Sequence, residues 1–116
     1  MHTESAILIH AGPDVVYQLA AAVERWPSIL PHYRWVRVLR DDGPTRLVEM
    51  AASRDGIPVH WWAEQELFPE VPRIAFRHVG GITRGMEVEW TFSSGPDGTL
   101  ARIRHDLDFR WLELGD

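Results

Sequence analysis

Short turn sequences divide the chain after residue 32 into six segments of strand length, and this spacing limits the possible folds more than any other feature. The segments run over about 33–40, 46–54, 57–68, 73–79, 84–94 and 98–110. The turns between them carry Asp41-Asp42-Gly43-Pro44, Asp55-Gly56, Pro69 to Pro72, Gly80-Gly81 and Gly95-Pro96-Asp97-Gly98. Gly, Pro and Asp favour turns because of the backbone angles they adopt. Connections this short join antiparallel neighbours, so the sequence predicts an antiparallel meander.

The last strand segments have one apolar face and one charged face. The residues expected on the apolar face are Ile74, Phe76 and His78, then Met86, Val88, Trp90 and Phe92, and finally Ala101, Ile103, His105, Leu107 and Phe109. Successive side chains of a strand point to opposite faces, so this alternation predicts a sheet with one covered side and one wet side. Glu87, Glu89, Arg102 and Arg104 share the wet side, which predicts cross-strand ion pairs there.

The first 32 residues read as one strand and a short helical region. Residues 3–10 form the expected strand, and Gly12-Pro13 suits a helix start because proline at the first helical position loses no hydrogen bond. The apolar stripe of the helix is expected to contain Val15, Val16, Leu19, Ala20 and Val23, which recur at spacings of three and four. Pro27 ends this helix and Pro31 bounds a second short helical turn.

Composition excludes several classes of function. The chain of 116 residues is 45% hydrophobic and carries a net charge of −5, so we expect one globular domain over 1–116 and no binding to nucleic acid. Without cysteine it has no disulfide, thiol nucleophile or cysteine-ligated zinc. The start Met1-His2-Thr3-Glu4 lacks the pattern of a secretory signal, which predicts a cytoplasmic protein, and no apolar run suggests stable membrane insertion. No glycine-rich phosphate loop or nucleophile elbow is present.

The stretch Glu24-Arg25-Trp26-Pro27-Ser28-Ile29-Leu30-Pro31-His32-Tyr33 resembles the helix-to-sheet elbow of the START-like, polyketide cyclase/dehydratase and lipid-transport families. That resemblance implies an α+β helix-grip fold, in which a curved antiparallel sheet of about seven strands surrounds an apolar cavity, with one or two short helices after the first strand. Trp26, Tyr33 and Trp90 match positions that line the family's pocket. The facing pattern adds Phe76, Met86, Val88 and Ile103 to the expected ligand-binding residues.

The strand over 57–68 allows two phases. Alternation alone places Val59, Trp61 and Ala63 toward the cavity, because that set is apolar. The resemblance favours the opposite phase, since the family's Trp-x-Trp-x-Ser-x-Arg pattern, aligned on Trp62, faces the cavity. We follow the resemblance, which adds His60 and Trp62 to the ligand-binding set and puts Glu64 and Glu66 in the cavity.

The catalytic candidates are Glu64, Glu66 and His105. Two carboxylates on one strand face could serve as general acid and base, and an imidazole among aliphatic side chains could bind a ligand carbonyl. Glu64 and Glu66 replace the family's Ser and Arg, which argues against true polyketide cyclisation. Arg54, just before the Asp55-Gly56 turn, could reach the mouth of the pocket, but we interpret it as a solvated turn residue. The expected register puts His78 and His105 roughly 14 Å apart, so we expect no metal site, and nothing in the sequence implies a cofactor.

Three functions remain open at this level. The first is a carrier or sensor of an apolar small molecule such as a lipid, quinone or aromatic polyketide-like compound. The second is a cyclase or dehydratase that uses acid-base chemistry. The third is an interaction module. The sequence ends before the long C-terminal helix that the resemblance implies, so we expect either that the domain is C-terminally truncated or that a second copy covers the apolar sheet face in a homodimer.

Overall fold

The computed structural model describes residues 1–107. Seven strands form one sheet with the order β1-β7-β6-β5-β4-β3-β2, and all pairs are antiparallel. The strands are β1 (His2–Ile9), β2 (Tyr33–Asp41), β3 (Thr45–Arg54), β4 (Ile57–Phe68), β5 (Arg73–Gly81), β6 (Glu87–Gly95) and β7 (Gly98–Asp106). The predicted meander is confirmed from β2 to β7, and β1 joins it at the far edge by pairing with β7.

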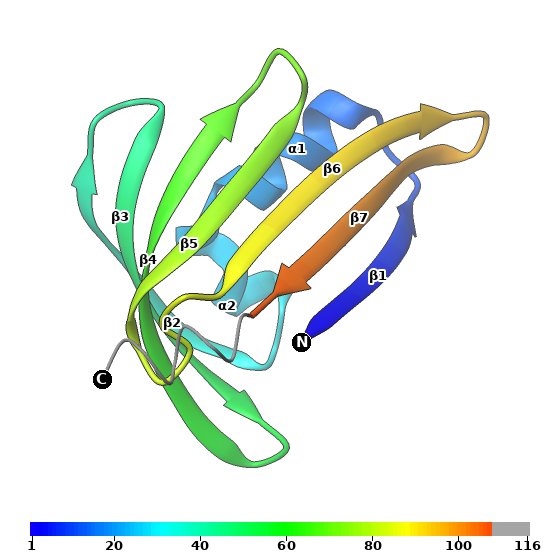
Figure 1. Ribbon diagram of the computed structural model, residues 1–116. Helices are drawn as coiled ribbons and strands as arrows, with labels where there is room; N and C mark the ends of the chain where they lie inside the picture. Colours follow the sequence, from blue (N-terminus) through cyan, green and yellow to red (C-terminus); the bar gives the residue numbers. More distant parts are fainter. Residues whose placement is uncertain (108–116) are drawn as a thin grey trace.

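The helices lie on the concave side of this curved sheet (Figure 1). They are α1 (Pro13–Ala21), the single 3-10 turn η1 (Val23–Arg25) and α2 (Trp26–Ile29). Figure 1 shows the strands curving around α1 and α2, as expected of the α+β helix-grip class, so the predicted fold class is confirmed. No helix among residues 1–107 is long and apolar enough to cross a membrane.

Helix α1 buries a narrower stripe than the sequence predicts. Val16, Tyr17 and Ala20 face the sheet, whereas Val15 is 53% and Leu19 is 42% exposed. The prediction was wrong for these two side chains because Tyr17 takes part in the stripe, where its ring packs edge-on against Phe92 with ring centroids 5.8 Å apart. A helix that packs one face against a sheet buries only about a third of its circumference.

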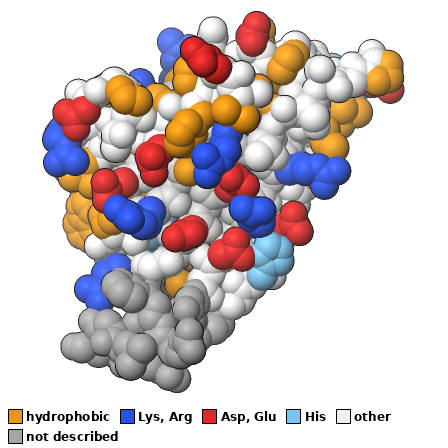
Figure 2. All heavy atoms as spheres, turned by 45° about the horizontal axis from the view of Figure 1, so that its top comes forward, with side chains coloured by type: hydrophobic (Ala, Val, Ile, Leu, Met, Phe, Trp, Pro, Cys, Tyr) orange, Lys and Arg blue, Asp and Glu red, His pale blue; other side chains and the backbone are white. Residues whose placement is uncertain are grey.

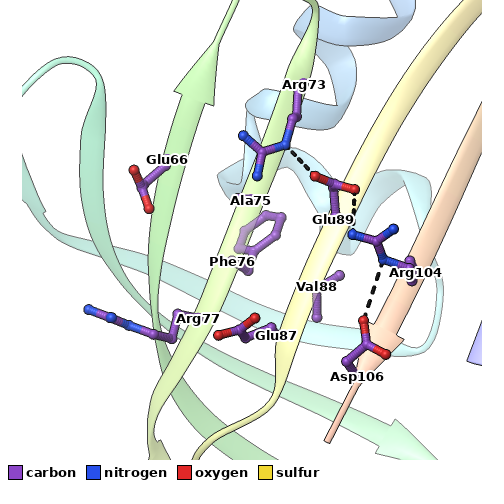
Figure 3. Close-up of a pocket in the computed structure, with 10 residues that line it drawn as sticks. All are labelled: Glu66, Arg73, Ala75, Phe76, Arg77, Glu87, Val88, Glu89, Arg104 and Asp106. Atoms are coloured by element: carbon purple, nitrogen blue, oxygen red, sulfur yellow. Dashed lines mark hydrogen bonds and ion pairs between the residues drawn. The ribbon is translucent and has the colours of Figure 1, made fainter. Parts of the chain in front are cut away.

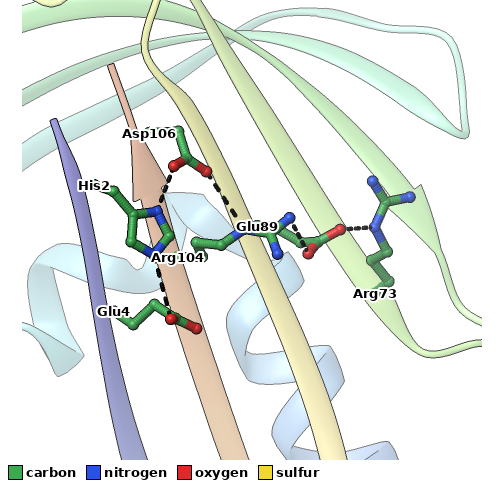
Figure 4. Close-up of polar contacts among 6 residues, drawn as sticks. All are labelled: His2, Glu4, Arg73, Glu89, Arg104 and Asp106. Atoms are coloured by element: carbon green, nitrogen blue, oxygen red, sulfur yellow. Dashed lines mark hydrogen bonds and ion pairs between the residues drawn. The ribbon is translucent and has the colours of Figure 1, made fainter. Parts of the chain in front are cut away.

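The outer, convex face carries the predicted ion pairs. Glu89 on β6 binds Arg104 on β7 at 2.8 Å and Arg73 on β5, and Arg104 also contacts Asp106 at 3.4 Å (Figure 3). Asp106 in turn binds His2 on β1 (Figure 4). Acidic and basic side chains are interspersed over this face of the molecule in Figure 2. The cross-strand prediction is therefore confirmed for Glu89 and Arg104.

Two strand ends differ from the prediction. Strand β6 begins at Glu87 rather than near residue 84, because residues 81–86 form a turn in which the Arg84 amide donates to the Gly81 carbonyl and the Met86 amide to the Thr83 carbonyl. Gly81 has φ +91°, and a Cβ there would lie 2.5 Å from the His60 carbonyl oxygen, so only glycine fits this close approach of β5 to β4. The described part of β7 ends at Asp106, and Phe109 lies outside the described residues.

Candidate ligand cavity

A cavity of about 400 Å³ lies between the concave face of the sheet and the segment around α2. Its wall comes from elements that are distant in sequence. They are β1, α2 and the residues after it, the first residue of β2, and strands β3 to β7 with the turn between β5 and β6. The lining residues are Ile7, Trp26, Leu30, His32, Tyr33, Met50, Ala52, Ser53, Arg54, Val59, Trp61, Phe76, His78, Thr83, Met86, Val88, Trp90, Ile103 and His105. Most are apolar, as in small-molecule sites that bury most of their ligand.

The aromatic part of the wall is organised by Trp26. Its ring centroid lies 5.1 Å from that of Tyr33, 5.7 Å from that of Phe76 and 5.4 Å from that of Trp90. Its indole N–H donates to the Ala20 carbonyl oxygen at 3.1 Å, so its polar atom is satisfied by the helix end. Pro27 follows directly inside α2. The Trp-Pro step therefore ends one helical segment, starts the next and places a large ring over the sheet.

Eight of the site residues predicted from the sequence share this wall. They are Trp26, Tyr33, Phe76, Met86, Val88, Trp90, Ile103 and His105. Burial of the Tyr33 phenol raises its pKa to about 12, so the hydroxyl stays protonated and available as a donor at neutral pH. The structure brings the eight side chains together, and their roles in binding stay predictions.

The other four residues, His60, Trp62, Glu64 and Glu66, lie on the outer face, which corrects the phase chosen for this strand. Trp61, Ala63 and Gln65 point inward and are 8%, 0% and 0% exposed. The apolar alternation was thus the better guide, because the opposite phase would desolvate two carboxylates. Glu64 instead pairs with Arg77 at 2.9 Å, and Glu66 lines a shallow groove of about 210 Å³ on the convex face (Figure 3).

Gln65 belongs to this inward phase although it is polar, and one of its two polar side-chain atoms has a partner among the described residues. Its side-chain amide donates to the carbonyl oxygen of Ala21, the last residue of α1, at 3.1 Å. Helix C-terminal carbonyls lack partners within the helix, so the buried amide supplies one. His60 and Trp62 form an outer cluster instead: their rings are 4.4 Å apart, and His60 Nε2 lies 2.8 Å from a Glu49 carboxylate oxygen.

One part of the cavity wall is polar. His78 is buried on β5, with Nδ1 2.7 Å from the Thr83 hydroxyl and its ring stacked on Trp61 at 5.5 Å between centroids. Burial lowers the His78 pKa to about 4, and the charge of His105 acts in the same direction. Burial, and after it the charge of Arg54, also lowers the pKa of His105. Both imidazoles are therefore neutral at pH 7. A neutral imidazole can accept a proton at one ring nitrogen and donate a hydrogen bond from the other.

Eleven residues of this wall were absent from the predicted site, among them Trp61, His78 and Arg54. Trp61 was assigned to the outer face, and His78 was placed inward without a functional role. Arg54 was interpreted as a solvated turn residue in preference to the mouth of the pocket, and it lies at the end of β3 as an exposed part of the cavity lining. The alternation of β4 could have identified Trp61. Within residues 1–107 no group of three or more His, Asp or Glu side chains is arranged to hold a metal ion.

Comparisons with known proteins agree with this geometry. Residues 9–114 match the polyketide cyclase / dehydrase and lipid transport family. The chain is 31% identical over 106 residues to the granaticin polyketide synthase bifunctional cyclase/dehydratase of Streptomyces violaceoruber, which covers 89% of this chain and 33% of that protein. The chain thus spans about a third of the length of this relative.

Solved structures show the same fold. The Zhui aromatase/cyclase of a Streptomyces species superimposes with a TM-score of 0.86 at 23% identity, covering 93% of this chain and 67% of the other. A START superfamily protein from Mycobacterium smegmatis gives 0.80 at 16% identity, covering 92% and 76%. On the extent of the family match and this shared fold, the chain belongs to the polyketide cyclase / dehydrase and lipid transport family.

Proposed function

We propose that this protein binds an apolar small molecule, such as a lipid, a quinone or an aromatic polyketide-like compound, as a carrier or sensor. The observation that carries the proposal is the cavity of about 400 Å³ walled by Trp26, Tyr33, Phe76 and Trp90. Aromatic side chains offer large, flat apolar surfaces with few rotatable bonds, which suits flat or ring-shaped ligands. The resemblance to proteins of lipid transport and polyketide cyclisation supports the same ligand class.

Trp90→Ala is expected to weaken the binding of an apolar fluorescent probe by about 1–3 kcal/mol, because the probe loses a ring it would contact. The probe should bind the unmodified protein with micromolar affinity and quench tryptophan emission. Fluorescence titration measures the dissociation constants of the probe for the unmodified protein and for Trp90→Ala. Trp62→Ala is the matched control, since that ring lies on the outer face against Gly80 and outside the cavity wall. Equal losses in the two variants would place the binding site elsewhere.

A second candidate function is acid-base catalysis in a cyclase or dehydratase. It is favoured by the neutral, half-buried His105 in the cavity wall, which could remove a proton next to a substrate carbonyl and return it to a departing hydroxyl as water. The outer-face position of Glu64 and Glu66 argues against their predicted catalytic roles and leaves His105 as the candidate base.

If this second function is correct, His105→Gln should reduce the dehydration rate of a β-hydroxy ketone probe by roughly 10²-fold or more, since a positioned general base contributes that much. Loss of the hydroxyl can be followed by absorbance of the conjugated product. Glu64→Gln serves as the control and should retain the full rate. If His105→Gln left the dehydration rate unchanged, acid-base catalysis by this residue would be excluded.

The homodimer and the cytoplasmic location stay predictions. The dimer was expected because the apolar sheet face would need cover, but Val88 and Phe92 on that face are already buried within the chain. Ile7 on the edge strand β1 is half exposed and gives a second copy a smaller apolar contact. Sedimentation velocity at tens of micromolar protein distinguishes a dimer from a monomer.

A further inference from the structure

The charged groups of the cavity wall have one sign. The wall contains no Asp or Glu side chain from residues 1–107, although the whole chain has 17 acidic and 12 basic residues. It contains one guanidinium, that of Arg54, together with the imidazoles of His32, His78 and His105. The one permanently charged group among these lining residues, the Arg54 guanidinium, is thus a cation. Such a cavity disfavours a cationic ligand and favours an anionic one.

Arg54 has no carboxylate partner among the described residues and, unlike the other arginines, lines the cavity. Five arginines of the described part each bind at least one Asp or Glu, namely Arg40, Arg46, Arg73, Arg77 and Arg104. Within residues 1–107 no acidic side chain lies within 4.0 Å of the Arg54 guanidinium. Its five N–H donors therefore remain available to a ligand at the cavity wall.

Two neutral donors in the same wall also lack partners. The indole N–H of Trp61 is buried and makes no hydrogen bond within the described part of the chain. The imidazole of His105, which is only partly buried, likewise makes no side-chain hydrogen bond to any residue between 1 and 107. A buried donor without an acceptor is unfavourable, so a ligand oxygen that reaches the Trp61 indole would relieve that cost.

Building on the proposed function, we infer that the ligand combines an apolar ring body with an anionic oxygen group, and that Arg54 selects for that group. The aromatic wall around Trp26 receives the rings. The anionic oxygen accepts hydrogen bonds from the Arg54 guanidinium and from an unpaired neutral donor of the wall. Arg54 occupies the last position of β3, opposite Ile57 on β4, so the hairpin holds its backbone in place.

The inference is tested with three probes that share one ring system and differ in the charge of a single substituent: anthracene-2-carboxylate, its neutral carboxamide and the corresponding aminomethyl cation. Dissociation constants are measured at pH 7.5 by quenching of tryptophan fluorescence. The carboxylate should bind about ten-fold more tightly than the amide, because hydrogen bonds to a charged group are stronger than neutral ones. The cation should bind most weakly.

Arg54→Gln should bring the carboxylate and the amide to within about three-fold of each other, because the neutral side chain cannot pair with the anion. Arg102→Gln is the matched control, since it removes the same charge from an exposed position of β7 outside the cavity wall and should preserve the preference. Circular dichroism checks that both variants are folded.

The outcomes separate the two proposals. If all three probes bind equally well, the cavity accepts apolar molecules and the inference about charge is wrong. A carboxylate preference that persists in Arg54→Gln and disappears in Arg102→Gln would also overturn it, because the selecting charge would then lie outside the cavity. If none of the probes binds, the proposed function itself fails.

Discussion

Trp26→Ala is expected to lower the free energy of unfolding by about 3–5 kcal/mol, the usual cost of replacing a buried tryptophan with alanine. The side chain is only 5% exposed and contacts Tyr33, Phe76 and Trp90. The substitution also leaves the Ala20 carbonyl without its indole donor. Because the same ring forms part of the cavity wall, probe binding should weaken as well. Urea denaturation followed by far-UV circular dichroism measures the change in stability.

Two further variants test which features of Trp26 stabilise the fold: one retains a ring without the hydrogen bond, and the other removes a tryptophan from the outer face. Trp26→Phe retains a ring and should recover part of the stability without the hydrogen bond to Ala20. Trp35→Ala removes a tryptophan from the outer face, where the ring lies beside His60 and under the Arg37 guanidinium, and should cost much less. If Trp26→Ala destabilised the protein no more than Trp35→Ala, the elbow after α1 would not be the centre of packing between helix and sheet.

Acidification from pH 7 to 4 is expected to reduce stability through His78 by about 3 kcal/mol. The folded state holds the His78 pKa near 4, mainly because the ring is buried, whereas the unfolded chain has the ordinary value of 6.5. The unfolded state therefore binds a proton first as the pH falls. Stability from this residue is present above pH 6.5 and is lost between pH 6.5 and 4, with each pKa unit worth about 1.4 kcal/mol.

The comparison for this prediction is His78→Asn, which can still bond to the Thr83 hydroxyl but does not titrate. Its urea-derived stability should change less between pH 7 and 4 than that of the unmodified protein. His2 acts in the opposite direction: Asp106 and Glu4 raise its pKa, so its contribution is present at low pH and is lost as the pH rises. Identical pH profiles for the unmodified protein and His78→Asn would show that the imidazole is not buried as described.

The sequence by itself determined the order of strands β2 to β7 and the facing of β5 to β7, whereas the pairing of β1 with β7 came from the structure. Connections of two to five residues favour antiparallel neighbours. Burying Glu87, Glu89 or Arg104 in place of Val88, Trp90 or Ile103 would be strongly unfavourable. The Trp-Pro elbow likewise indicated the family, and the sequence pattern predicted Trp26 and Tyr33 at the elbow and most cavity residues of β5 to β7. These features depend on local chemistry, which is visible along the chain.

The tertiary structure alone decided the phase of β4 and the electrostatics of the cavity. Gln65 is accepted inside because α1 ends beside it and presents a free carbonyl at Ala21, and Glu64 turns outward to Arg77 on the next strand. Arg54 becomes part of the cavity wall because the curvature of the sheet brings the end of β3 toward His105 on β7. Each of these contacts joins residues that are distant in sequence, and their free energy depends on which partners the closed sheet brings together.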